Sequence, residues 1–177
     1  YSFSWMSCLQ ARAARAEEAL RNLQIFVRAF ILRNGFHVNG DQLKAGFSSF
    51  TYRPFTLEGN FLAPEAVHDM LLQSWDGVLQ VFPAMPWRWH HASFSRLRAE
   101  GGWIVSAQWD NNACIYLEIE ATRDAELVLV NSFNGREVHW NRPVTRRESD
   151  TFVFALRAGD KLIGTLDKPT VIPPQPA

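Results

Sequence analysis

The sequence has few cysteines and no long apolar run. Only two of its 177 residues are cysteine, Cys8 and Cys114, and they fall in different predicted elements. We therefore expect two buried thiols rather than a disulfide framework. No apolar run approaches the roughly 20 residues that are needed to span a bilayer. The sequence thus contains no transmembrane helix, and we expect no membrane partner.

The sequence also lacks an excess of either charge. It has 18 Lys and Arg residues against 18 Asp and Glu residues, and the basic residues are scattered rather than arranged in a stripe. Because nucleic-acid binding usually requires a basic patch or stripe, we expect no nucleic-acid partner. Neither cysteine has a Cys or His partner at metal-ligand spacing, and the pair His90-His91 lies in a Trp-rich loop. We expect no metal site and no cofactor.

The chain does not begin with Met, and no charged segment precedes an apolar one as in a signal peptide. Its first residues already have the pattern of an amphipathic helix, which indicates a piece of a longer protein. Localisation cannot be determined from these residues, because any signal peptide would lie upstream. A secreted or periplasmic location is one option.

Aromatic residues, in contrast, are abundant. The chain is 47% hydrophobic and contains seven Trp and thirteen Phe, which is more than core filling usually requires. Most of these side chains are expected to form the core. The alternative for some of them is a carbohydrate-binding cleft, in which flat aromatic faces lie against the apolar faces of sugars.

The first half of the chain has a helical period. We predict helices over residues 1–11 and from residue 16 to about residue 32, packed as an antiparallel pair and ended by Gly35 as a left-handed cap. Residues 36–63 show no period and are predicted to form a long loop. Pro64 is predicted as the first residue of a third helix that ends near Ser74.

The second half of the chain has a period of two, which is typical of strands. A turn at Asp76-Gly77 opens this half, and the prolines of the C-terminal tail are expected to lie extended along the surface. The pattern predicts an α+β chain whose second part is an antiparallel β-sandwich. The predicted strands cover residues 78–82, 103–109, 113–120, 126–131, 151–156 and 161–166.

Three segments carry a resemblance to a known family: residues 55–61 (FTLEGNF), residues 64–74 (PEAVHDMLLQS) and residues 97–105 (LRAEGGWIV). Together they resemble glycoside hydrolase family 95, the α-L-fucosidases and their α-L-galactosidase relatives. The resemblance implies that residues 1–75 are the last helices and active-site loop of a catalytic (α/α)6 barrel. It also implies that residues 76–177 are a C-terminal β-sandwich domain with a Pro-rich tail.

Glu58 is the candidate catalytic residue. It is a lone carboxylate between Leu57 and Phe61, where partial burial would raise its pKa. The resemblance implies that Glu58 replaces a family Asp that helps asparagines to activate the attacking water, in a motif that otherwise shares Gly-Asn-Phe. On the residues alone, Glu58 could instead cap the helix at Pro64 or pair with Arg53.

Four further residues are candidates for substrate binding. Tyr52 stands where the family has the His of His-Pro-Pro-Phe, and a residue so close to the base is expected to touch the sugar. Arg53 could clamp a hydroxyl or steady Glu58, and Asn60 could orient Glu58 or cap the helix. Trp5 could line the pocket or belong to the barrel core. Gly59 is expected to provide an unusual backbone angle beside Glu58.

The resemblance implies an inverting glycoside hydrolase that acts on terminal α-linked L-fucose or a related L-sugar. Such an enzyme needs two carboxylates, and the family's general acid and Asn pair match no position in this chain. The active site would therefore be incomplete without an upstream part of the same polypeptide. The alternative is a non-catalytic carbohydrate-binding or structural β-domain with a helical appendage, in which Glu58 is structural.

Overall fold

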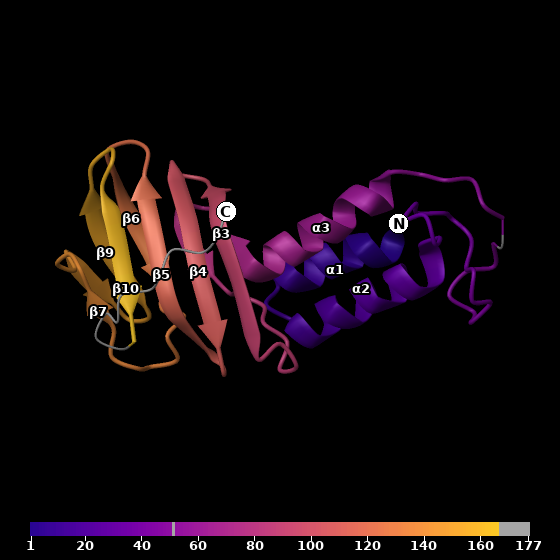
Figure 1. The fold of residues 1–177 in the computed structure, drawn as a ribbon, viewed down its shortest axis with the longest axis horizontal. Helices are drawn as coiled ribbons and strands as arrows, with labels where there is room; N and C mark the ends of the chain where they lie inside the picture. The colour runs from indigo at the N-terminus through magenta and orange to yellow at the C-terminus, as the bar shows by residue number, and fades with distance from the viewer. Residues whose placement is uncertain (51, 167–177) are drawn as a thin grey trace. The chain divides into compact units, whose positions relative to one another are not determined.

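The computed structural model describes residues 1–50 and 52–166. The chain divides into two compact units, each of which is described by itself (Figure 1). The helical unit consists of Tyr1–Leu71 and Pro83–Trp87, and the β unit consists of Leu72–Phe82 and the residues from Arg88 onward. The predicted Pro-rich tail, residues 167–177, lies outside the described residues.

The helical unit contains α1 (Ser2–Arg12), α2 (Ala16–Phe30) and α3 (Glu58–Leu71), and α1 packs against both of the others. The first two helices confirm the predicted ones. Small residues allow close approach, since Ala11, Ala19 and Ala66 are fully buried. The Ser7 hydroxyl donates a hydrogen bond to the carbonyl oxygen of Ala19 at 2.7 Å, which links α1 to α2.

One ion-pair group joins α1 to α3. The Arg12 guanidinium lies 2.7 Å from Asp69 and 3.1 Å from Glu65. Asp69 is buried, and this burial raises the pKa of its carboxyl even though the hydrogen bond from Arg12 acts in the opposite direction.

The start of α3 corrects the prediction that the loop runs to residue 63 and the prediction that Pro64 is the first helical residue. The helix begins at Glu58 rather than at Pro64, and its first helical hydrogen bond runs from the Phe61 N–H to the Leu57 carbonyl at 3.0 Å. Pro64 lies inside the helix. It lacks an N–H and so cannot bond to the carbonyl of Asn60, but this loss affects one position and the helix continues past it.

The connection between α2 and α3 corrects the predicted cap at Gly35. Helix α2 ends at Phe30, and its C-cap Ile31 is extended and pairs with His37 in an isolated bridge. Gly35 does have a positive φ of 82°, but it closes a turn in which its N–H donates to the Leu32 carbonyl. A second bridge joins Val38 to Phe55, so the loop folds back upon itself beneath the start of α3.

The β unit consists of two five-stranded sheets. One has the strand order β1-β2-β6-β9-β8 and the other has the order β3-β4-β5-β10-β7. The strands are β1 (Leu72–Gln73), β2 (Val78–Val81), β3 (His91–Ala99), β4 (Trp103–Asp110), β5 (Ala113–Ala121), β6 (Ala125–Val130), β7 (His139–Trp140), β8 (Arg146–Glu148), β9 (Thr151–Leu156) and β10 (Lys161–Thr165).

The two sheets share one aromatic core. The ring of Trp140, on β7, lies 5.3 Å from the ring of Phe152 and 4.9 Å from that of Phe154, both on β9 of the other sheet. Gly164 on β10 faces Trp140 so closely that a Cβ there would collide with the indole ring. The arrangement is compatible with the predicted β-sandwich.

The strand prediction was right for six strands and incomplete for the rest. The pattern missed β3, which is mostly exposed, and the short strands β1, β7 and β8. It was also wrong to make every pairing antiparallel, because β2 pairs with β6 in parallel. The turn at Asp76-Gly77 is confirmed, since both residues have positive φ.

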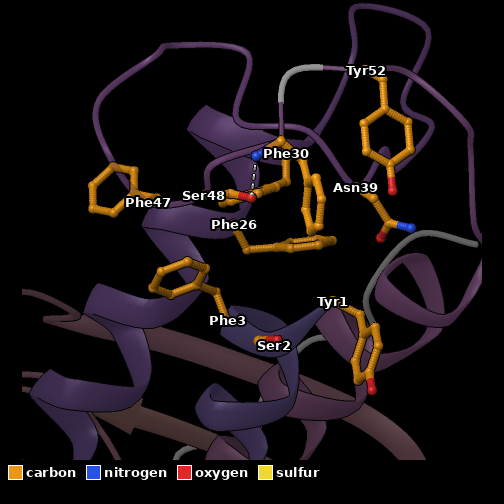
Figure 2. A pocket seen from close by; sticks show the side chains of 10 residues that line it. Tyr1, Ser2, Phe3, Phe26, Phe30, Asn39, Phe47, Ser48 and Tyr52 are labelled. Carbon is orange, nitrogen blue, oxygen red and sulfur yellow. Dashed lines mark hydrogen bonds between the residues drawn. The ribbon is translucent and has the colours of Figure 1, made fainter.

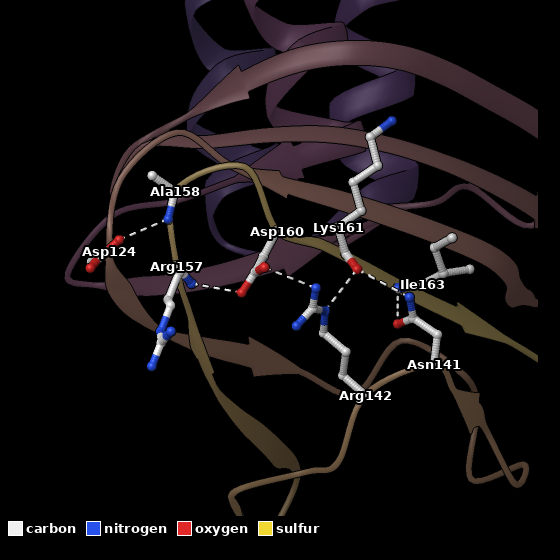
Figure 3. Close-up of polar contacts among 8 residues, drawn as sticks. All are labelled: Asp124, Asn141, Arg142, Arg157, Ala158, Asp160, Lys161 and Ile163. Atoms are coloured by element: carbon white, nitrogen blue, oxygen red, sulfur yellow. Dashed lines mark hydrogen bonds and ion pairs between the residues drawn. The ribbon is translucent and has the colours of Figure 1, made fainter.

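Polar contacts fix the edge of the second sheet (Figure 3). The Asn141 side chain accepts a hydrogen bond from the N–H of Ile163 at 2.7 Å and donates one to the Lys161 carbonyl at 3.1 Å. Arg142 also donates to that carbonyl and forms an ion pair with Asp160 at 2.9 Å. The connection that follows β7 is thereby tied to β10.

Among the described helices, none is long and apolar enough to cross a membrane.

Candidate active site at the start of α3

Glu58 lies in the first turn of α3 and is exposed. The prediction that it sits partly buried in an apolar loop is therefore wrong. Its apolar neighbours are exposed as well, with Leu57 at 42% and Phe61 at 69% of full exposure. A carboxylate is favourable at this position because the N-terminal end of a helix carries partial positive charge.

The structure places Arg53 away from the predicted partner. Its Nε–H donates to the side-chain oxygen of Gln42 at 2.8 Å. Within residues 1–50 and 52–166, Glu58 forms no ion pair, so the alternative in which it pairs with Arg53 is wrong. The carboxylate of Glu58 is open to solvent.

Asn60 connects α3 to the loop beneath it. Its side-chain oxygen accepts a hydrogen bond from the backbone N–H of His37 at 2.8 Å, and its amide donates to the carbonyl of Gly35 at 2.7 Å. Both polar ends of this side chain are therefore engaged by backbone. In the described structure Asn60 holds the first turn of α3 against residues 35–37, whereas the sequence predicted contact with Glu58, a helix cap or substrate.

Gly59 is required by close packing rather than by an unusual backbone angle, which corrects the prediction. A Cβ at this position would lie 2.7 Å from both Cγ and Nδ1 of the His37 ring and 2.7 Å from the ring of Phe26. The backbone next to Glu58 thus rests directly on two aromatic rings, and no side chain larger than hydrogen fits between them.

His37 is the centre of this arrangement, and the sequence did not single it out. It is fully buried, with its ring 5.1 Å from that of Phe26. Its Nε2 lies 3.1 Å from the main-chain nitrogen of Tyr1, and its Nδ1 lies 2.7 Å from the Thr56 hydroxyl and 3.1 Å from the Thr56 carbonyl. Burial lowers the pKa of His37, an effect that nearby Glu58 opposes.

An aromatic pocket lies at the same end of the helical unit (Figure 2). It has a volume of about 320 Å³, and Tyr52, one of the predicted substrate-binding residues, lies in its wall. None of its lining residues has a charged side chain. They are Tyr1, Ser2, Phe3, Phe26, Phe30, Asn39, Phe47, Ser48, Phe50 and Tyr52.

The buried carboxylate of Asp41 holds one wall of this pocket. It accepts hydrogen bonds from the backbone N–H groups of Leu43, Ala45 and Phe47 at 2.9–3.0 Å. These bonds fold the loop that carries Phe47, Ser48 and Phe50. A single Asp in a loop has no recognisable sequence signal, and Asp41 was missed for that reason.

Tyr1 connects the pocket to His37, whereas Trp5, a predicted substrate-binding residue, lies apart from the pocket. Tyr1 joins the two features described above, since its side chain lines the pocket and its nitrogen contacts His37. Trp5 is not among the pocket's lining residues and lies 49% exposed on α1. Within the described part of the chain, no three His, Cys, Asp or Glu residues are arranged to hold a metal ion.

Comparison with known proteins gives two matches. A family model described as glycoside hydrolase family 95, C-terminal domain, matches residues 73–163, which is about half of the chain. The chain is also 31% identical over 110 residues to alpha-L-fucosidase 2 of Arabidopsis thaliana. This similarity covers 62% of the present chain and 13% of that protein. The match to the family model begins after Glu58.

Proposed function

The chain belongs to the C-terminal domain family of glycoside hydrolase family 95, and we propose that it forms the C-terminal part of an inverting glycoside hydrolase. The proposed substrate is a terminal α-linked L-fucose or a related L-sugar. The observation that carries the proposal is the solvent-open carboxylate of Glu58 in the first turn of α3, next to Gly59, which rests on the pocket-lining ring of Phe26.

Glu58 is proposed to act on the water side of the sugar. An inverting enzyme places its two carboxyl groups about 6.5–9.5 Å apart so that a water molecule fits between the base and the sugar. One carboxylate cannot serve both faces. The general acid is therefore proposed to come from an upstream part of the same polypeptide, and this chain alone is expected to show no glycosidase turnover.

The pocket is proposed to hold a neutral saccharide. Ligand sites are commonly lined by aromatic side chains with a few polar groups that fix orientation. Here Asn39, Ser48 and Tyr52 offer hydrogen-bonding groups among aromatic walls, which suits an uncharged molecule with both hydroxyls and apolar faces. Arg53, Asn60 and Trp5 stay predictions as substrate-binding residues.

The exposed apolar side chains of α1 support a place for the helical unit in a larger helical assembly. Trp5, Met6 and Leu9 are 49%, 36% and 41% exposed, and their spacing puts them on neighbouring turns of one helix. We propose that this face packs against further helices of an (α/α)6 barrel, of which α1, α2 and α3 would be the last. For Trp5 this is the alternative to substrate binding.

One observation favours the alternative function, a non-catalytic carbohydrate-binding or structural β-domain. The family match covers most of the β unit, and an open groove of about 560 Å³ lies where β3 begins and β4 ends, beside Ile115 of β5. Nδ1 of His91 lies 2.7 Å from the carboxylate of Asp110 in this groove, beside Gln108 and Trp109. Under this alternative, sugar would bind here and Glu58 would have no part in it.

The test is Glu58→Gln in the longer polypeptide, assayed with an aryl α-L-fucoside. Loss of a positioned base typically lowers the rate by about 10² to 10⁴. The matched control is Glu65→Gln, on the same helix, which removes only a surface ion pair with Arg12 and should cost at most about 1 kcal/mol in unfolding free energy.

The two proposed functions give different results. If Glu58→Gln keeps turnover within about threefold of the parent while the melting temperature falls, Glu58 is structural. Saccharide binding that survives Glu58→Gln but is lost with Trp109→Ala would establish the binding function of the β unit in its place.

A further inference from the structure

We propose that His37 is a positioning residue for Glu58: its buried ring supports the first turn of α3 and thereby sets where the carboxylate stands. The inference rests on the proposed function, in which Glu58 acts on the sugar. It concerns a residue outside the family motif, and it follows from contacts that converge on both sides of Glu58.

The first contact is steric. The Gly59 backbone lies so close to the His37 ring that a Cβ there would be 2.7 Å from Cγ and from Nδ1. Glu58 is bonded directly to Gly59. The contact between Gly59 and the His37 ring therefore also fixes the position of the Glu58 backbone. Because the ring of Phe26 lies 2.7 Å from that same position, two rings support the glycine and the first turn has little room to sink or tilt.

The second set of contacts is polar and surrounds Glu58 in sequence. On the N-terminal side, the Thr56 N–H donates to the His37 carbonyl at 3.1 Å. On the C-terminal side, the His37 N–H donates to the Asn60 side chain at 2.8 Å. Residues two before and two after Glu58 are thus bonded to the same histidine.

The ring itself is held in one orientation by its two nitrogens. Nε2 of His37 lies 3.1 Å from the amino terminus of the 177-residue chain at Tyr1, and since this group can only donate when it is protonated, Nε2 accepts from it. A neutral imidazole with Nε2 as acceptor carries its proton on Nδ1, which donates to the Thr56 carbonyl. Burial lowers the pKa of His37 and favours this neutral form, whereas the Glu58 charge acts in the opposite direction.

A 1 Å displacement of a reacting group can cost about 100-fold in rate without any change in chemistry. His37→Ala removes the support beneath Gly59. We expect kcat to fall by about 10- to 100-fold while KM for an aryl α-L-fucoside stays within about twofold. A residue that only stabilises the fold would lower the melting temperature and leave kcat of the folded protein unchanged.

Two further variants make the experiment decisive. His37→Phe keeps the ring but removes its nitrogens, so it should lower the melting temperature yet keep kcat within about fivefold of the parent. Gly59→Ala inserts a methyl group between the helix and the ring. It should also lower kcat, because it pushes the first turn of α3 away from the ring, whereas His37→Ala removes the support. All variants are made in the longer polypeptide, with Glu58→Gln measured in parallel.

The outcomes separate the inference from the function on which it rests. Unchanged turnover in Glu58→Gln would overturn the proposed function itself. A large loss in Glu58→Gln together with parental kcat in His37→Ala would overturn only the role of His37, as would equal losses in His37→Ala and His37→Phe. If neither histidine variant folds, Gly59→Ala decides, and parental kcat in that variant contradicts the inference.

Discussion

The helical unit and the β unit differ most clearly in how many large apolar side chains they leave exposed to solvent. Among the described residues, fifteen such side chains are exposed, and fourteen of them belong to the helical unit. The exception is Trp75, at 38%. The fourteen are Tyr1, Trp5, Met6, Leu9, Val27, Phe36, Leu43, Phe47, Phe50, Tyr52, Phe55, Leu57, Phe61 and Trp87.

This difference indicates that the β unit completes its own core and the helical unit does not. Phe133, Phe154 and Leu162 are at most 1% exposed in the β unit. Contiguous apolar surface on a soluble domain usually marks a place where another surface binds. The chemistry is thus proposed in the less self-sufficient unit, which suits a site whose second carboxylate is expected from elsewhere in the polypeptide.

The largest difference in unfolding free energy between the units should appear when one phenylalanine is replaced by alanine in each unit. Phe154→Ala removes a ring that is 1% exposed and packed against Trp140, so it should lower the unfolding free energy by about 3–5 kcal/mol. Phe61→Ala removes a ring that is 69% exposed and should change the unfolding free energy by less than about 0.5 kcal/mol. Denaturant unfolding of the 177-residue chain measures both. A cost above about 2 kcal/mol for Phe61→Ala would show that the helical unit buries more than its exposure indicates.

A smaller effect should appear in the helical unit on acidification. Burial lowers the pKa of His37 below its ordinary value of 6.5, so its stabilising contribution is present above that pH and is lost as the pH falls through the lowered value. One proton changes the unfolding free energy by at most about 1.4 kcal/mol per pH unit.

Hydrogen exchange of α1 and α2 between pH 7 and pH 5 measures this loss, and His37→Gln is the control without the titrating ring. Asp69 acts with the opposite sign at lower pH, because burial raises its pKa above 3.8 and its contribution is lost as the pH rises. Equal pH dependence of exchange in the parent and in His37→Gln would contradict the assignment of this stability loss to His37.

The regular elements could be predicted from the sequence because their patterns are local. The apolar residues of α2 recur at helical spacing, and the residues of β5 alternate in burial along most of the strand. β3 could not be found in this way, since most of its residues are exposed and it is defined by its pairing with β4, which appears only in the folded chain. The parallel pairing of β2 with β6 joins residues about fifty positions apart, which no local period records.

The motif around Glu58 could be predicted from the sequence, but the contacts that hold the candidate site in place could not. Glu58 could be chosen from the residues around it, but the exposure of this carboxylate depends on where α3 begins, and Pro64 gave the wrong start. His37 and Asp41 act through backbone groups far along the chain or around a loop. Contacts of this kind place no pattern in the sequence, so only the folded chain reveals them.

The central claim, that the β unit is self-contained and the helical unit is not, can be tested directly because each unit holds one buried cysteine. Burial raises the pKa of the Cys8 thiol to about 11 and that of the Cys114 thiol to about 12. Neither thiol should react near pH 8 while folded, so labelling reports how often its unit opens.

The measurement is the labelling rate of each cysteine in the native 177-residue chain, followed by peptide mass spectrometry. We predict that Cys8 is labelled at least about tenfold faster than Cys114, which corresponds to a difference of about 1.4 kcal/mol in opening free energy. Equal labelling rates, or faster labelling of Cys114, would contradict the account.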